Sequence, residues 1–232
     1  MKKKNLAFTL AEVHIVIGII GVDAALTLPN LNHATGDKER VTKVNKIYST
    51  LTEALDRAQV IYGDYDTWFG DLSTLQEKSE RFAKRVTEFM KISKDCGYAG
   101  QGCFSSDTGK TLDSSYTQGI GPMPDSGYRL ITSDNMSLIF KGINSYITVD
   151  IDGPNKGENT FGKDLFNFYI NDDNILSSKM TSGPGPAPLY FGLAAANWIL
   201  ENDNADYLKA DSNLKCNDSN IILNGTTNTS CH

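Results

Sequence analysis

The sequence predicts an α+β fold in which one long N-terminal helix precedes an antiparallel sheet of about four strands. The helix is indicated by residues 8–61, where apolar side chains first form a continuous run and then recur on one helical face. Short β-type runs indicate the strands, at 128–133, 136–141, 145–151 and 165–170. The connections between the first three runs are two or three residues long, as is typical of β-hairpins.

The composition narrows the class of protein. The chain has 232 residues, a formal net charge of −6, 40% hydrophobic residues and 22% charged residues. This balance excludes a polytopic membrane protein, a collagen and a wholly disordered chain. The excess of carboxylates argues against a surface that binds nucleic-acid phosphates, so no nucleic-acid partner is predicted.

The first half of the long helix is predicted to span a membrane. Three lysines at 2–4 precede an apolar run that ends at Leu28, which is the layout of an export signal. Residues 8–28 would form a helix of about 31 Å, long enough to cross the hydrocarbon core of a bilayer. Because a carboxylate in such surroundings needs a cationic partner, Glu12 is a candidate functional group.

The second half of the long helix is amphipathic. Its apolar positions recur every three or four residues and are Val41, Val44, Ile47, Tyr48, Leu51, Ala54, Leu55 and Ala58. Another helical pattern covers 72–94, and a short one covers 193–200. Residues 105–127 are rich in Ser, Gly, Asp and Pro and are predicted to be a loop. Four aromatic residues, Tyr62, Tyr65, Trp68 and Phe69, are predicted to cap the core, and a binding patch is the alternative.

Residues 7–21, AFTLAEVHIVIGIIG, resemble the N-terminal signature of type IV prepilins and type II secretion pseudopilins. The resemblance covers roughly the first 30 residues. In that family a membrane-embedded prepilin peptidase cuts before the Phe and methylates the new amine, so the matching bond is Ala7–Phe8. Ala7 stands where the family usually has Gly, and His14 and Asp23 stand where it has apolar residues.

Glu12 matches the acid that the family keeps at the fifth place of the mature chain. The resemblance implies that it pairs with the free amine of Phe8 on a neighbouring subunit and sets the stagger between subunits. It also implies a leader at 1–7, a single-pass inner-membrane helix and a periplasmic or extracellular globular head at 62–232. In this pilin-like architecture the sheet lies on the amphipathic half of the long helix.

The resemblance implies a structural subunit of a type IV pilus or a type II secretion pseudopilus. Its partners would be prepilin peptidase, other pilin or pseudopilin subunits and an inner-membrane assembly platform. Two alternatives remain open. The first is a minor pilin that acts as an adhesin or ligand-binding tip through 105–127 and the tail from 183. The second is an ordinary secreted protein whose signal is cut near Ala24 or Ala25.

One loop concentrates oxygen ligands. It resembles a loop of pseudopilin-like heads, some of which bind calcium, and its candidate ligands are Asp150, Asp152, Asn159 and Asp164. Calcium takes six to eight oxygen ligands on a flexible loop. The alternative is a structural loop of Asx turns without a metal. No other cofactor is predicted.

The four cysteines pair by locality as Cys96 with Cys103 and Cys216 with Cys231, although four cysteines allow three pairings. The export signal places them in an oxidising compartment, where disulfides persist. Reduced thiols and a zinc site are the alternatives. No enzyme is predicted, because two of the three histidines lie in the long helix, at 14 and 33, and the third is residue 232, at the far end of the tail.

Overall fold

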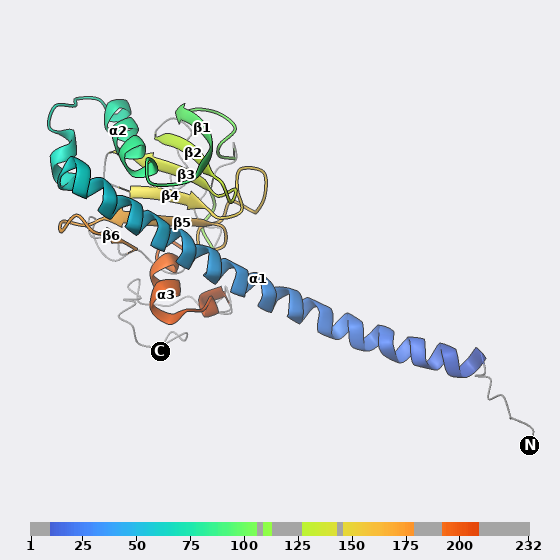
Figure 1. Ribbon diagram of the computed structural model, residues 1–232. Coiled ribbons are helices and arrows are strands. Elements are labelled where there is room, and N and C mark those ends of the chain that lie inside the picture. The colour runs from blue at the N-terminus through green and yellow to red at the C-terminus, as the bar shows by residue number, and fades with distance from the viewer. Residues whose placement is uncertain (1–9, 106–108, 113–126, 143–145, 179–191, 209–232) are drawn as a thin grey trace, which may run out of the picture. The chain divides into compact units, whose positions relative to one another are not determined.

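The computed structural model describes residues 10–105, 109–112, 127–142, 146–178 and 192–208 (Figure 1). Between 10 and 35 it describes the backbone and the side chain of Ile17 alone, and at 206 the backbone alone. The chain forms two compact units, 1–39 and 40–232. The long helix α1, Leu10–Tyr62, begins in the first unit and ends in the second. Its helical backbone continues through Pro29.

The second unit has an α+β architecture. After α1 come the 3-10 helix η1 (Tyr65–Phe69), α2 (Leu75–Thr87), β1 (Ile92–Tyr98), β2 (Tyr128–Thr132), β3 (Ser137–Lys141), β4 (Tyr146–Asp150), β5 (Leu165–Ile170), β6 (Leu176–Ser177), α3 (Ala195–Asn202) and η3 (Asp206–Leu208). The strands form one six-stranded sheet in the order β1-β2-β3-β4-β5-β6, and all neighbours are antiparallel. The α+β class and the four predicted strands are therefore confirmed.

The prediction of about four strands was too low, and that of one helix over 72–94 was too long. The helix α2 ends at Thr87, and Ile92 already belongs to β1. Pairing with β2 holds β1 in the sheet, with Ile92 opposite Thr132 and Tyr98 opposite Tyr128. The helical pattern depends only on neighbouring residues, so it cannot reveal pairing with a strand so distant along the chain. The other missed strand, β6, has only two residues.

The helices α1 and α2 pack on the same face of the sheet (Figure 1). Along α1 the predicted face is buried, since Val44, Leu51 and Ala58 have no exposed surface. Tyr48 of α1 contacts Phe168 of β5, with 5.7 Å between the ring centroids. A capping box at Thr74 starts α2, which places Phe82 against Phe140 of β3. These contacts belong to one apolar core.

The opposite face of the sheet is also covered. Every residue of β2, β3 and β5 is buried. A second, smaller apolar cluster on this face contains Phe104, Ile139, Phe161 and Leu165. Because both faces are buried, these strands combine apolar residues with buried polar ones such as Thr148 and Asn167, which hydrogen-bond to each other.

Of the four aromatic residues predicted to cap the core, Tyr65 and Trp68 belong to it and Phe69 packs against it, whereas Tyr62, at the end of α1, is exposed. Gly63 ends α1 with a φ of 81°, a left-handed conformation that glycine adopts without steric cost. Its carbonyl accepts a hydrogen bond from the Trp68 indole N–H at 2.7 Å. Tyr65 and Trp68 are almost fully buried, and the Tyr65 ring lies 5.0 Å from Phe82. The turn after α1 therefore joins that helix to α2.

Candidate functional site

The residues of the N-terminal signature lie largely outside the described part of the chain. Ala7 and Phe8 are not described, and Glu12 is described only as helical backbone. Within the predicted membrane span at 8–28 only the side chain of Ile17 is described, and Cys216 and Cys231 lie outside the described residues. Among the helices whose side chains are described, none is long and apolar enough to cross a membrane.

The 150–164 loop joins β4 to β5 and is organised by two of its own carboxylates. Asp150 ends β4, and its Oδ1 accepts hydrogen bonds from the backbone N–H groups of Asp152 and Gly153 at 3.0 and 3.1 Å. Asp164 accepts from the backbone N–H groups of Asn159 and Thr160. These are the Asx-type contacts of a structural loop.

The remaining oxygens of the four candidate ligands differ in their surroundings. Asp152 forms an ion pair with Lys43 of α1, with 2.8 Å between Oδ1 and Nζ. By contrast, the Oδ2 of Asp150 and the Oδ1 of Asn159 are buried and find no hydrogen-bond partner among the described residues. The Oγ of Ser137, directly across the ladder from Asp150, is equally buried and without a partner there.

Burial shifts the titration of this loop. Loss of hydration, together with the charges of Asp164 and Asp152, raises the pKa of Asp150 to about 7, against the lowering effect of the two backbone N–H donors. Burial also raises the pKa of Asp164. At neutral pH the loop therefore contains a half-ionised carboxylate that a cation would stabilise.

The four residues fit a calcium ion only in part. The carboxylates of Asp152 and Asp164 are already committed to Lys43 and to the loop backbone. Within the described residues no three His, Cys, Asp or Glu side chains gather as metal ligands. A calcium ion here would draw on the free oxygens of Asp150 and Asn159 and, beyond them, on neutral oxygens.

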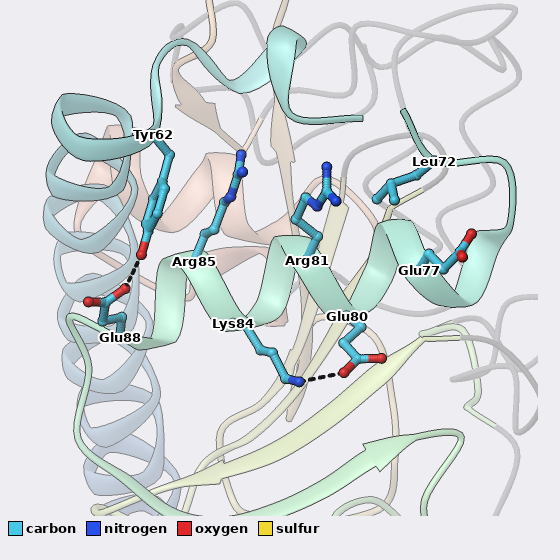
Figure 2. Close-up of a pocket in the computed structure, with 8 residues that line it drawn as sticks. All are labelled: Tyr62, Leu72, Glu77, Glu80, Arg81, Lys84, Arg85 and Glu88. Carbon is cyan, nitrogen blue, oxygen red and sulfur yellow. Dashed lines mark hydrogen bonds and ion pairs between the residues drawn. The ribbon is translucent and has the colours of Figure 1, made fainter. Parts of the chain in front are cut away.

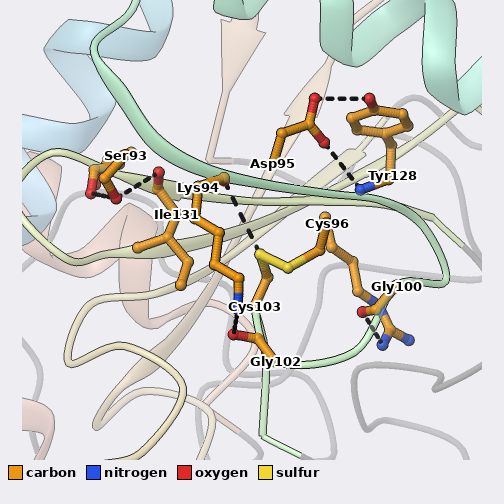
Figure 3. The surroundings of a disulfide bond; sticks show 12 residues. Ser93, Lys94, Asp95, Cys96, Gly100, Gly102, Cys103, Tyr128 and Ile131 are labelled. Atoms are coloured by element: carbon orange, nitrogen blue, oxygen red, sulfur yellow. Dashed lines mark hydrogen bonds between the residues drawn. A yellow bond between two sulfur atoms is a disulfide. The ribbon is translucent and has the colours of Figure 1, made fainter.

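Cys96 and Cys103 form a disulfide at the end of β1, with an S–S distance of 2.06 Å and 6.0 Å between their Cα atoms (Figure 3). The enclosed loop is tied down by two cations. Arg129 donates to the carbonyl of Gly100 and Lys94 to that of Gly102, both at 3.0 Å. The arrangement orders an exposed loop beside the sheet edge.

Replacing both Cys96 and Cys103 with alanine is expected to lower the free energy of unfolding by about 2–3 kcal/mol, because the unfolded chain regains the freedom of the closed loop. Urea denaturation of the full-length chain, followed by circular dichroism, measures the loss. The double variant Cys216→Ala/Cys231→Ala is the matched control, since it keeps the bond at 96–103. A loss below about 0.5 kcal/mol would mean that Arg129 and Lys94 order the loop unaided.

Sequence reasoning missed a surface hollow of about 430 Å³ beside α2. This α2 hollow is lined by Tyr62, Leu72, Glu77, Glu80, Arg81, Lys84, Arg85 and Glu88. The lining comes from three segments, and its charged members look like an ordinary solvated helix face. The available signal was the spacing of Arg81 and Arg85, which places both guanidinium groups on one side of a helix.

Comparisons of the chain with protein-family models, with curated proteins and with solved structures find no match.

Proposed function

We propose that the chain is a structural subunit of a filament of the type IV pilus or type II secretion pseudopilus kind. The observation that carries the proposal is the packing of the C-terminal part of the long helix on an antiparallel sheet. The signature at 7–21 resembles the processing site of such subunits. The disulfide between Cys96 and Cys103 supports an oxidising, extracytoplasmic location for the second unit.

The contacts of α1 suit the mechanical demand on such a subunit. A filament held together by its helices transmits force to each globular unit through the helix, so helix and sheet must not separate. Besides its apolar face, α1 is fastened to the loop before β5 by Arg40, which donates to the Lys163 carbonyl at 2.6 Å. Lys43 adds its ion pair with Asp152. Through these two polar contacts the 150–164 loop helps to hold α1 against the sheet.

In this proposal, prepilin peptidase removes residues 1–7 and methylates the amine of Phe8. Residues 8–28 then anchor the subunit in the inner membrane. As the assembly platform adds a subunit to the filament, the carboxylate of Glu12 pairs with the Phe8 amine of a neighbouring subunit. Withdrawing either charge leaves the other unpaired in apolar surroundings, which is strongly unfavourable.

The substitution Glu12→Gln is expected to leave cleavage intact but to lower filament yield roughly tenfold or more, because one charge of the pair is lost. Coexpression with a prepilin peptidase, mass spectrometry of the mature N-terminus and electron microscopy of filaments give the readouts. Glu53→Gln is the control, since Glu53 is exposed and pairs only with Arg57 on the helix surface. A mature chain that begins near Leu26 would identify an ordinary secreted protein instead.

A further inference from the structure

The α2 hollow contains a cation in contact with two aromatic rings. The guanidinium of Arg85 lies 4.7 Å from the centroid of the Tyr62 ring and 5.2 Å from that of Trp68. Figure 2 shows Arg81 and Arg85 extending to the same side of α2, between Tyr62 and Leu72. Contact with two rings restricts the movement of the Arg85 side chain, so less of its freedom is lost when its N–H groups bind a ligand.

The other charged side chains of the α2 hollow have partners. These pairs are Arg81 with Asp71, Lys84 with Glu80, Glu77 with Thr74 and Glu88 with Tyr62. Among the described residues Arg85 makes neither a hydrogen bond nor an ion pair, although it is half-buried. Burial lowers the pKa of Arg85 and the nearby charge of Arg81 lowers it further, whereas Tyr62 and the more distant carboxylate of Asp71 raise it. The α2 hollow therefore has one partly desolvated positive charge that forms no direct ion pair with a described residue.

The chemistry of this charge selects among anions. A carboxylate presents two oxygens that match the fork of N–H donors on a guanidinium, and charge-assisted pairs of this kind are strong. A phosphate with two negative charges calls for more cations, whereas Arg81 and Lys84 are already neutralised. The carboxylates of Glu80 and Glu88 at the rim would repel a polyanion. Tyr62 and Leu72 offer apolar contact to the carbon skeleton of a ligand.

We propose that the α2 hollow binds a carboxylate group of a peptide ligand, with Arg85 as the bidentate donor and Tyr62 and Leu72 against the adjoining carbon atoms. The carboxylate is either an acidic side chain or a peptide C-terminus. This binding is independent of filament assembly, because its residues belong to the second unit and not to the N-terminal signature. Failure of one proposal therefore leaves the other standing.

Nuclear magnetic resonance of the isotope-labelled full-length chain in detergent micelles tests the proposal. The probes are N-acetyl-glutamate amide for the side-chain source and N-acetyl-leucine for the C-terminal source, each beside its neutral carboxamide. Saturable shifts of the Arg85 Nε–H and Trp68 indole N–H signals are expected, with a Kd of roughly 1–10 mM. The acid that binds more tightly identifies the source.

The substitution Arg85→Gln is expected to weaken binding at least roughly tenfold, and Arg85→Lys to weaken it less, because lysine keeps the charge without the fork. Arg57→Gln is the matched control, since Arg57 is an exposed arginine paired with Glu53 elsewhere on the surface. A dispersed spectrum shows that each variant is folded. If Arg85→Gln does not fold, the weaker binding expected of Arg85→Lys tests the proposal instead.

Three results would overturn the proposal. The first is the lack of any saturable shift with either acid up to roughly 50 mM. The second is equal binding of an acid and its carboxamide, or unchanged binding by a folded Arg85 variant. The third is binding of inorganic phosphate as tight as that of the carboxylates, which would assign the α2 hollow to a different anion.

Discussion

The substitution Phe82→Ala is expected to lower the free energy of unfolding of the second unit by about 3–5 kcal/mol. Phe82 has no exposed surface. Its ring meets Phe140 of β3 edge-on at 5.1 Å and Tyr65 of η1 at 5.0 Å. Removing it leaves a cavity where α2, η1 and the sheet meet. Urea denaturation of the full-length chain measures the loss.

The matched control for Phe82 is Val60→Ala in the last turn of α1. Val60 is 87% exposed, so its truncation is expected to change the free energy of unfolding by no more than about 0.5 kcal/mol. If Phe82→Ala costs less than about 1 kcal/mol, α2 does not pack on the sheet through this ring.

The second large effect is expected at Asp150. The substitution Asp150→Asn should raise the free energy of unfolding at pH 8 by an amount on the order of 4 kcal/mol, because a pKa of about 7 in the folded state opposes ionisation of this buried carboxyl. An amide can still accept the N–H groups of Asp152 and Gly153. It carries no charge into the position of the partnerless Oδ2.

The sign of the pH dependence follows from linkage. An unfolded aspartate loses its proton near pH 3.9, whereas folded Asp150 keeps its proton up to a pH of about 7. Between these values the folded state binds more protons than the unfolded state. Stability therefore falls as the pH rises through this window and levels off above it. The Asn variant should lack this decline, which thermal melting from pH 4 to 8 would reveal. Asp172→Asn, in an exposed turn, should keep it.

Calcium distinguishes the two interpretations of the 150–164 loop. If the loop binds calcium through Asp150, the ion should raise the melting temperature of the wild-type chain at pH 8 and leave Asp150→Asn unchanged. A calcium concentration of about 100 times the Kd would add about 2.7 kcal/mol. Neither heat in a calorimetric titration nor a rise in melting temperature is expected if the loop is purely structural.

The long helix and four strands could be predicted because their signals are local. The spacing of Val44, Leu51 and Ala58 indicates the buried face of α1, and the first three β-type runs, between 128 and 151, follow one another through short connections. The strand β1 escaped prediction because most of its side chains are half-exposed or exposed, so it lacks an apolar signature. Its place in the sheet depends on β2, thirty residues further along the chain.

The candidate site was less accessible to sequence reasoning. The composition of the 150–164 loop revealed its oxygen ligands. Which of its carboxylates are paired, however, depends on distant residues. Lys43, 109 residues earlier in the chain, neutralises Asp152, and Ser137 across the ladder contributes to the burial of Asp150. The importance of Arg85 depends on which neighbouring charges are already paired, and only the folded chain defines those pairs.

The strand order β1-β2-β3-β4-β5-β6 has a consequence for the order of events during folding. Each strand pairs with its predecessor, so the sheet can grow strand by strand as the chain emerges. The buried face of α1, by contrast, packs against strands that are far away along the chain. Tyr48 reaches the carbonyl of Leu176 across 128 residues, and Arg40 reaches Lys163 across 123. A chain delivered N-terminus first therefore carries an uncovered apolar helix until β5 and β6 arrive. During that interval the nascent protein is prone to aggregation, and a chaperone that binds unfolded chains would bind the apolar face of α1.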